Sequence, residues 1–377
     1  MNKRATLFNQ VTGPLFIDIA NAYLSEFDEV VLITGSIEPT SADLNPKIKV
    51  ILKSKYKRNK GYLRIYTWLL FFFQSFFYTL FRKDHGEMLI TSNPPLLPFL
   101  GSIFSHRKKT KFNVLVLDVY PDALSNFGYI KEGSLLYRFW DRMNNKIYHE
   151  AERVFTISNV MKEVISRNAK KDKIEVVYPW VDTSFIKPLE KQNNWFVKKY
   201  GLLDKRVILY SGNMGMTHDL MTVLNAAKVL DVPTNNFHFL FIGDGAQKES
   251  LIEYKENNKL SNITFLPYQD PEVLPFSFAS ADFGIVSLGK GAEGLSVPSK
   301  TFYMLATGAA IISISSPGSE VSNLLKENDC GVNIMPSKFE DLLMFLNSIT
   351  DEDLNIYKAN SRNLSKIFTI INAYKYL

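Results

Sequence analysis

A proline, a serine and a lysine in the second half of the chain have the types and spacing of an anion-binding turn. The stretch from Glu293 to Ile312 reads EGLSVPSKTFYMLATGAAII. Pro298 suits the first turn of a helix, where its missing N–H is not needed, and the free N–H groups of such a turn attract an anion. Ser299 lies in the same turn, and Lys300 adds a full positive charge. The stretch therefore predicts a phosphate-binding turn at the start of a helix.

The end of this helix is also marked in the sequence. Gly308 stands where a helix commonly ends on a left-handed residue. Ala309 to Ser315 is an apolar, Ile-rich run of the kind found in buried strands. The sequence thus predicts a helix followed by a strand, with an anion site at one end of the pair.

Two glycine turns follow apolar runs and precede helical stretches. The first, YSGNMGMTHD at 210–219, contains Gly212 and Gly215, which allow a tight turn whose amides can hold phosphate. The second is the GDG sequence at 243–245. Each turn is weak evidence alone, but their succession before the lysine turn is much less expected by chance. His218 is predicted either to contact phosphate or to pack at a helix start.

Carboxylates offer one candidate for proton transfer and none for a metal. Asp118 ends a predicted strand, four residues before Asp122, where it can position or deprotonate an acceptor hydroxyl. The alternative is that it caps the following turn. The DED run at 351–353 resembles a metal-binding string, but acidic residues also favour a helix start. One Cys and five His give no zinc set. We expect neither a metal ion nor a cofactor.

Strand and helix signals alternate along the chain. Near-continuous apolar strands between helices imply parallel sheets covered on both faces, and the pattern occurs twice. The prediction is an α/β fold of two Rossmann-like domains facing a cleft, with ligands beyond the carboxyl ends of the strands. The predicted strands are 30–34, 88–91, 112–117, 153–157, 206–210, 237–242, 263–266, 283–286 and 310–315, and the predicted helices include 16–27, 134–149, 159–167 and 354–360.

Length and composition agree with two domains. A chain of 377 residues is too long for one ordinary core, and its 46% apolar content argues against disorder. The polar stretch 182–199 marks a boundary, which gives an acceptor-binding domain at 1–185 and a nucleotide-sugar-binding domain at 186–360. The segment 361–377 is expected to cross back to the first domain. The single cysteine and the lack of a secretory signal predict a cytoplasmic protein.

A basic and aromatic segment at 53–83 stands out in the first half, which carries most of the positive charge of a chain with net charge +6. Its run YTWLLFFFQSFFYTLF at 66–81 is shorter than the roughly 20 apolar residues that span a bilayer. As a helix it would lie in the membrane interface with Lys and Arg at anionic headgroups. The alternative is a helix packed on its own sheet. The predicted polar stripe is Lys60, Arg64, Thr67, Gln74, Ser75 and Arg82. No motif supports nucleic-acid binding.

Taken in order, these motifs resemble the retaining GT-B glycosyltransferases of glycosyltransferase family 4, the group that is similar to glycogen synthase and mannosyltransferases. The branch most resembled builds bacterial capsule and O-antigen and acts on amino-sugars such as N-acetylfucosamine. The resemblance covers nearly the whole chain. It is carried by TSNPPLL at 91–97, LDVYPDAL at 117–124, VVYPWVDTSFIKP at 176–188, YSGNMG at 210–215, FIGDG at 241–245, LPY at 266–268 and SLGKGAEGLSVPSKTF at 287–302.

The resemblance implies roles for individual residues. The first loop would approach the donor phosphates, the turn after Leu266 would receive the nucleotide base, and lysines would lie near the pyrophosphate or sugar. Glu293 would accept from a sugar hydroxyl, and together with Lys300 and Asp118, which was singled out by its place at a strand end, it forms the predicted catalytic set. The implied donor-binding residues are Gly13, Gly212, Asn213, His218, Gly243, Leu266, Tyr268, Lys290, Gly294, Leu295, Ser296 and Ser299.

Two positions depart from the family pattern. Where the family commonly has paired glutamates eight residues apart, this chain has Leu295 and Tyr303. Where it commonly has a phosphate-binding basic pair after the first glycine turn, this chain has Asn213 and His218. The nucleotide is therefore expected to be held differently from that in most relatives.

The resemblance implies a metal-independent transferase that uses a nucleotide-sugar, with UDP the expected nucleotide. The implied acceptor is a polyprenyl-pyrophosphate-linked glycan at the inner face of the cytoplasmic membrane. Front-side attack with retention, assisted by the leaving phosphate, is the implied mechanism. Two alternatives remain open: a non-catalytic GT-B scaffold at the membrane, and a nucleotide-sugar epimerase.

Overall fold

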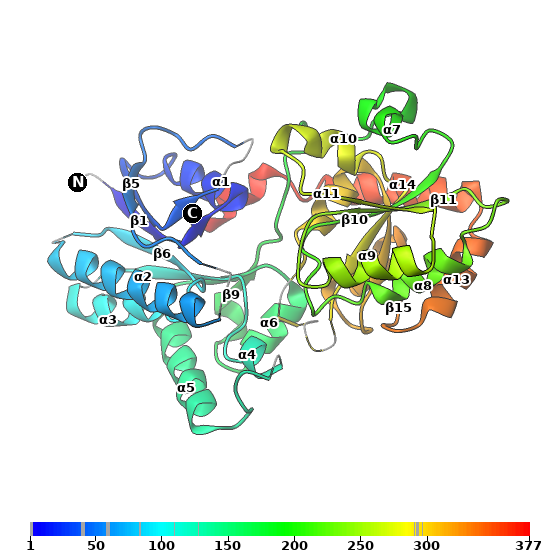
Figure 1. The fold of residues 1–377 in the computed structure, drawn as a ribbon. Helices are drawn as coiled ribbons and strands as arrows, with labels where there is room; N and C mark the ends of the chain where they lie inside the picture. Colours follow the sequence, from blue (N-terminus) through cyan, green and yellow to red (C-terminus); the bar gives the residue numbers. More distant parts are fainter. Residues whose placement is uncertain are drawn as a thin grey trace. The chain divides into compact units, whose positions relative to one another are not determined.

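The computed structural model describes residues 3–38, 42–57, 61–82, 84–108, 110–126, 128–289, 291, 294–295 and 297–377. The chain forms two compact units. Unit 1 comprises Met1–Pro179, Gly294–Ser296 and Ile370–Leu377, and unit 2 comprises Trp180–Glu293 and Val297–Thr369. Each unit is a parallel sheet with helices packed against it, so the predicted α/β class with two parallel sheets is confirmed (Figure 1).

The sheet of unit 1 has seven strands in the order β5-β3-β1-β6-β7-β8-β9. The interior strand β1 was missed from the sequence because RATLF is short and carries polar residues at its first and third positions. It pairs with β3 and β6 over almost its full length. The strands are β5 (Lys49–Leu52), β3 (Glu29–Thr34), β1 (Arg4–Phe8), β6 (Glu87–Thr91), β7 (Phe112–Val116), β8 (Val154–Thr156) and β9 (Ile174–Val176).

Helices cover both sides of this sheet. One side carries α1 (Pro14–Tyr23) and the C-terminal 3-10 segment η4 (Ile370–Tyr376), which contact each other. The other carries α2 (Gly61–Phe81), α3 (Phe99–Lys108) and α5 (Leu135–Glu150), as Figure 1 shows. Shorter elements are the two-stranded sheet of β2 (Val11–Thr12) and β4 (Ser36–Ile37), α4 (Asp122–Asn126), α6 (Asn159–Ile165) and the 3-10 turn η1 (Lys171–Lys173).

Helix α2 packs on its unit with its small polar residues inward. Its buried residues are Thr67, Phe71, Ser75 and Thr79. The carbonyl of Thr67 accepts from Gln10 Nε2 at 3.0 Å, so part of this inward face is fixed by hydrogen bonds. Thr67 and Ser75 belong to the predicted polar stripe, of which Lys and Arg were expected at the headgroups. Both are buried against unit 1, and Thr67 is held there because its carbonyl accepts from Gln10 and its hydroxyl donates to Arg64 O at 3.0 Å. Apart from the buried Phe71, several aromatic side chains of α2, such as Phe73 and Phe77, face outward.

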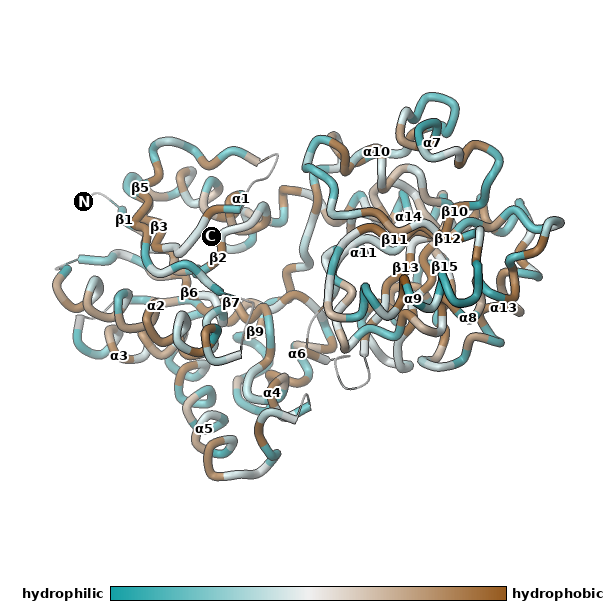
Figure 2. Tube along the Cα trace, viewed as in Figure 1, coloured by the Kyte–Doolittle hydropathy of each residue, from teal (hydrophilic) through white to brown (hydrophobic). Residues whose placement is uncertain are grey.

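The outward face of α2 is an apolar stripe, and α2 is brown along much of its length in Figure 2. None of the described helices has the length and apolar character needed to cross a bilayer. The exposed members of this stripe, from 42% to 79% exposed, are Tyr62, Ile65, Tyr66, Leu69, Phe73, Phe77 and Phe81.

The sheet of unit 2 has six parallel strands in the order β12-β11-β10-β13-β14-β15. Its core is aromatic and aliphatic, with Tyr210, Phe239 and Phe283 fully buried. The strands are β12 (Ile263–Leu266), β11 (Phe237–Ile242), β10 (Arg206–Ser211), β13 (Phe283–Ser287), β14 (Ala310–Ile314) and β15 (Gly331–Ile334).

Two groups of helices cover this second sheet. Contacts join α8 (Met221–Val229) to α9 (Lys248–Asn257) and α13 (Phe339–Ser348), and they join α11 (Lys300–Thr307) to α10 (Leu274–Phe278) and α14 (Asp351–Ser365). The groups lie on opposite sides of the sheet in Figure 1. The remaining elements are α7 (Trp195–Lys199), α12 (Glu320–Asn328) and the 3-10 turns η2 (Lys191–Asn193) and η3 (Pro271–Val273).

Two helix boundaries in unit 2 follow their local sequence. Helix α11 ends at Gly308, which has φ +73°, so the predicted left-handed end is confirmed. The DED run begins α14, where Thr350 and Asp353 form a capping box. Asp351 also pairs with Arg206. The run therefore has a structural role at a helix start.

Candidate functional site

The two glycine turns of unit 2 meet at the carboxyl edge of its sheet, because β10, β11 and β12 are parallel neighbours. The N–H of Gly212 donates to Ile242 O at 2.8 Å, and the N–H of Gly243 donates to Leu266 O at 3.0 Å. Both glycines have φ +137°. A Cβ on Gly243 would lie 2.0 Å from Gly212 O, so no side chain fits there. The backbone chains of the two turns therefore pack directly on each other.

Further hydrogen bonds fix the shape of the turns. The N–H of Met214 donates to Asp244 O at 2.7 Å, and Gln247 Nε2 donates to His218 O at 2.8 Å. Sequence reasoning missed Gln247, since nothing local marks a glutamine that joins two distant turns. The amides of Gly212, Gly243 and Met214 are thus used within the protein. A ligand at this edge needs other donors.

Lys300 provides such a donor. Its Nζ lies 3.6 Å from the centroid of the Tyr210 ring and 3.1 Å from where a Cβ on Gly212 would stand. The Nζ atom is buried and has no hydrogen-bond partner among the described residues. Burial lowers the pKa of Lys300 from 10.5 to about 7. An unpaired buried ammonium is costly, and an anionic ligand would remove that cost.

His218 lies between Tyr210 and the first glycine turn. Its Nδ1 is 2.7 Å from Tyr210 Oη and 2.8 Å from Asn213 O. Because a carbonyl only accepts, this network assigns the proton to Nδ1 and leaves Nε2 as an acceptor. Burial and the nearby charge of Lys300 lower the pKa of His218 to about 4. In this arrangement His218 is neutral near pH 7 and suits a ligand hydroxyl better than a phosphate oxygen.

Three more predicted residues lie near this cluster in unit 2. Leu266 is half-buried and its carbonyl accepts from Gly243. Tyr268 follows β12, is 58% exposed and lies close enough to help raise the pKa of Tyr210 above its usual range, after burial. Ser299 precedes α11, is exposed, and its side chain makes no capping bond. The carboxyl edge of this sheet therefore gathers most of the predicted donor-binding residues.

The structure places other predicted residues elsewhere. Lys290, Glu293 and Ser296 lie outside the described residues. Gly294 and Leu295 belong to unit 1, where Leu295 O accepts from Val119 N at 3.4 Å. Leu295 is 5% exposed.

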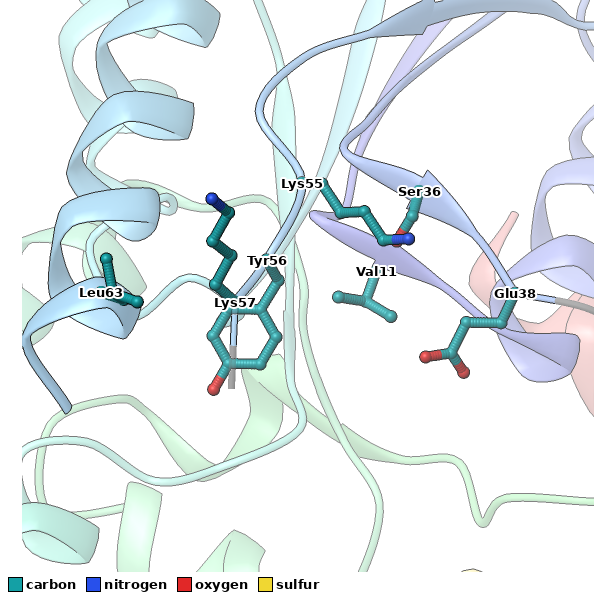
Figure 3. A pocket seen from close by; sticks show the side chains of 7 residues that line it. All are labelled: Val11, Ser36, Glu38, Lys55, Tyr56, Lys57 and Leu63. Carbon is teal, nitrogen blue, oxygen red and sulfur yellow. The ribbon is translucent and has the colours of Figure 1, made fainter. Parts of the chain in front are cut away.

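Gly13 lies in unit 1 beside a basic cavity. It precedes α1 and accepts from the N–H groups of the first turn. A Cβ there would stand 3.6 Å from Glu38 Oε2. Figure 3 shows the cavity, with Lys55 and Lys57 extending in opposite directions from the segment after β5. Its volume is about 630 Å³, and it is lined by Val11, Ser36, Glu38, Lys55, Tyr56, Lys57 and Leu63.

Asp118 lies just beyond the end of β7 in unit 1. Ser92 Oγ donates to its carbonyl at 3.2 Å and accepts from its N–H at 3.3 Å. The carboxylate makes no hydrogen bond or ion pair among the described residues, so it caps no turn there. Burial raises its pKa from 3.8 to about 6. Asp118 also contributes, after burial, to raising the pKa of Tyr120.

The described residues contain no group of three or more His, Cys, Asp or Glu side chains placed to hold a metal ion. The described residues thus place a buried, unpaired ammonium at the carboxyl edge of the sheet of unit 2 and a buried carboxylate without a partner just beyond β7 in unit 1.

Comparisons with known proteins identify the type of fold. No family model matches the chain. The probable glycosyltransferase WbjE of Pseudomonas aeruginosa is 26% identical over 289 residues, which are 75% of this chain and 72% of WbjE. WcaI of Escherichia coli K12, whose name refers to a colanic acid biosynthesis glycosyl transferase, is 27% identical over 47% of this chain and 44% of its own.

Solved structures resemble the chain over almost its whole length. Anabaena Alr3699/HepE in complex with UDP-glucose has a TM-score of 0.74 at 13% identity, over 99% of this chain and 97% of that one. Sucrose-phosphate synthase from Thermosynechococcus elongatus gives the same TM-score, identity and coverage. The fold is that of the GT-B glycosyltransferases. The chain therefore has the GT-B fold and is related in sequence to the probable glycosyltransferase WbjE and to WcaI.

Proposed function

We propose that this protein is a glycosyltransferase that moves a sugar from a nucleotide-sugar to a lipid-linked glycan during synthesis of a bacterial surface polysaccharide, capsule or O-antigen. The observation that carries the proposal is the buried, unpaired ammonium of Lys300 beside two interlocked glycine turns. The diphosphate of a nucleotide would give this ammonium the negatively charged hydrogen-bond partner that it lacks. The relation to WbjE and WcaI supports the same reaction class.

The expected nucleotide is UDP. Structural neighbours that are bound to UDP and to UDP-glucose support this choice. In the proposed complex Lys300 binds the pyrophosphate, Tyr268 and the turn after Leu266 receive the base, and His218 Nε2 accepts from a sugar or ribose hydroxyl. An N-acetylated amino-sugar of the N-acetylfucosamine type is the proposed donor sugar.

The proposed reaction retains the anomeric configuration and uses no metal. The acceptor hydroxyl attacks the anomeric carbon on the face from which the phosphate leaves, its proton passes to a leaving phosphate oxygen, and the glycosidic C–O bond of the donor breaks. Lys300 stabilises the charge that develops on the phosphate. Asp118 positions the acceptor hydroxyl, and Lys290 and Glu293 complete the donor site.

The proposed location is the inner face of the cytoplasmic membrane. The apolar stripe of α2 and nearby cations support this, because an aromatic helix face with adjacent Lys and Arg suits the interface of an anionic bilayer. The segment 53–83 would make the contact. Cations beside the stripe are Lys49, Lys53 and Arg82, which share a surface hollow with Phe77 and Phe81. A polyprenyl-pyrophosphate-linked glycan is an acceptor available at that surface.

A thermal-shift panel with UDP, GDP, UDP-N-acetylglucosamine and GDP-mannose tests the donor site. We expect uridine compounds to raise the melting temperature selectively, since a ligand that binds only the native state stabilises it. Lys300→Ala should abolish this shift. Lys326→Ala, at an exposed position of α12, is the matched control and should keep it. A chain that no nucleotide stabilises would contradict the donor site.

The competing function is a non-catalytic GT-B scaffold at the membrane. It is favoured by Leu295 and by Tyr303, whose ring stacks on Phe278 at 5.1 Å, because these two apolar groups stand where the family commonly has glutamates. UDP binding without sugar transfer to any lipid acceptor would select the scaffold. Turnover of free nucleotide-sugar without acceptor would select an epimerase.

A further inference from the structure

We infer that unit 1 contains a binding pocket for the hydrocarbon chain and first phosphate of a prenyl phosphate, the lipid part of the acceptor. The inference rests on the proposed function and adds a site to it. The pocket lies between α2, the turn after β6 and the start of α5. Its volume is about 420 Å³, and its lining residues are Gly61, Arg64, Ile65, Trp68, Leu69, Phe72, Pro94, Pro95, Leu96, Leu124, Tyr129, Ile130, Leu136 and Trp140.

The lining is apolar except for groups that donate hydrogen bonds. Arg64 Nε, Trp68 Nε1 and Trp140 Nε1 are buried and have no hydrogen-bond partner among the described residues. The described lining contains no carboxylate. Buried polar groups are almost always paired, so three unpaired donors on one pocket indicate a ligand rich in acceptor atoms. A hydrocarbon with a phosphate at one end satisfies both the walls and the donors.

Arg64 is the candidate phosphate ligand. Its guanidinium lies over the rings of Trp68, at 5.5 Å, and Tyr129, at 5.8 Å. No carboxylate lines the pocket beside Arg64 in the described part of the chain. A guanidinium that contacts aromatic rings in place of a carboxylate keeps its N–H groups available, and its fork matches phosphate oxygens. The charge needed to neutralise Arg64 is then supplied by the ligand.

The pocket lies next to two features of unit 1, the apolar stripe of α2 and the region of Asp118. Ile65 and Leu69 belong to the pocket and also to the exposed apolar stripe of α2, which gives a hydrocarbon chain a continuous apolar route. On the other side, Trp68 contacts Tyr120, and Tyr120 stacks on Trp140 at 6.0 Å. Tyr120 in turn is near Asp118. The lipid phosphate would thus lie on the side of the pocket that is nearest Asp118, the residue proposed to position the acceptor hydroxyl.

A second aromatic contact leads to the basic cavity of Figure 3. Tyr56, which lines that cavity, stacks on Trp68 with centroids 6.1 Å apart. Lys55 and Lys57 flank Tyr56. An acceptor whose chain lies in the apolar pocket would place further anionic or sugar groups toward these lysines. The order hydrocarbon, phosphate, glycan along the acceptor then matches the order apolar pocket, Arg64, basic cavity.

Tryptophan fluorescence tests the pocket directly, since two of the four tryptophans line it. Farnesyl phosphate is titrated into the full chain below its micelle concentration, with farnesol and inorganic phosphate as comparisons. We expect saturable quenching by farnesyl phosphate, weaker binding of farnesol and none of inorganic phosphate. Arg64→Gln should weaken farnesyl phosphate roughly tenfold or more and leave farnesol unchanged, because only the charged hydrogen bond is lost.

Two adjacent leucines give a matched pair. Leu136 lines the pocket, whereas Leu135 does not, and both are exposed enough for substitution without unfolding. Leu136→Asp should weaken both prenyl ligands, and Leu135→Asp should weaken neither. Equal binding by the two variants, no binding of farnesyl phosphate to wild type, or equal effects of Arg64→Gln on both ligands would each overturn the inference.

The assay also separates this inference from the proposed function. It uses neither nucleotide nor sugar transfer, so the pocket can bind prenyl phosphate even if the chain transfers no sugar. Conversely, transfer to lipid-linked acceptor that proceeds equally well in Leu136→Asp would leave the transferase proposal intact and overturn the pocket.

Discussion

Lys300 is the residue at which folding and binding oppose each other. Its ammonium is buried beside Gly212 and Tyr210 without a hydrogen-bond partner among the described residues. Such a group costs folding free energy and is retained where a ligand needs it. Removing it should therefore stabilise the free protein and weaken nucleotide binding together.

The melting temperature of Lys300→Met, measured against pH, tests whether the buried charge destabilises the free protein. Below pH 7 the lysine is charged in both folded and unfolded chains, and the wild type carries the full cost of burying the charge. Between the folded pKa of about 7 and the ordinary value of 10.5, the unfolded chain binds a proton that the folded chain lacks, so wild-type stability rises with pH. We expect Lys300→Met to melt roughly 10 °C higher than wild type at pH 6, a difference that shrinks toward pH 9.5. A pH-independent difference in melting temperature would contradict the buried charge.

Asp118 is the second residue with a testable ionisation. Its pKa of about 6 means that the carboxylate is largely ionised at pH 7 and protonated below pH 5. If it positions the acceptor hydroxyl, transfer by the wild type should fall as the pH drops through 6. Asp118→Asn should lose roughly 100-fold in kcat and should lack this acid limb.

Two measurements separate a role in catalysis from damage to the fold. The UDP thermal shift should stay unchanged in Asp118→Asn, because Lys300 lies in the other unit. Asp172→Asn, an exposed aspartate of unit 1, should transfer like the wild type. Retention of full activity by Asp118→Asn would assign Asp118 no part in the reaction.

At the scale of elements, α2 shows how one helix serves two surfaces. Thr67, Phe71, Ser75 and Thr79 pack it on unit 1, while Phe73 and Phe77 on the opposite face are about half exposed. The periodicity of small polar residues thus marks the packed face. The aromatic residues remain available to a membrane.

Paired substitutions on the two faces of α2 test this division. Phe73→Ser with Phe77→Ser should leave the melting temperature nearly unchanged and weaken binding to vesicles that contain anionic phospholipid at least tenfold, since each buried Phe is worth about 2 kcal/mol. Vesicle co-sedimentation measures the binding. Phe71→Ala, at a fully buried position, should instead cost about 3 kcal/mol of stability. Unchanged sedimentation of the double variant would contradict membrane contact through α2.

At the scale of the whole molecule, the chain returns to its first unit at its C-terminal segment. Residues Ile370–Leu377 belong to unit 1. Tyr376 is fully buried, its ring lies 4.7 Å from that of Phe155, and its carbonyl accepts from Tyr23 Oη at 3.0 Å. Unit 1 is therefore completed by residues that follow unit 2 in the sequence.

Two tyrosines of this segment, two positions apart, allow a controlled test. Tyr376→Ala should destabilise unit 1 by about 3 kcal/mol through the cavity it leaves. Tyr374→Ala, at a position that is 54% exposed, should have little effect. Calorimetry measures both, and UDP should still stabilise unit 2 in Tyr376→Ala. Equal melting of the two variants would show that the segment adds nothing to the stability of unit 1.

Some of this could be predicted because its cause is local. Apolar runs predicted most strands of both sheets, and the φ of +73° at Gly308 follows from what a helix end requires. The turns at Gly212 and Gly243 were recognisable because a glycine between a strand and a helix usually marks a tight turn. Their spacing sufficed to predict an α/β fold and an anion site near Lys300.

Tertiary structure alone decided the rest, because the causes are contacts between distant residues. Nothing in RATLF shows that β1 lies inside the sheet, since its position depends on pairing with two later strands. The inward face of α2 was set by partners such as Gln10, which no helical wheel contains. The placement of the Lys300 ammonium over Tyr210, ninety residues earlier in the chain, exists only after the sheet has formed. Local sequence therefore specified the turns and most of the strands, and long-range packing set the protonation and accessibility of the groups that carry the chemistry.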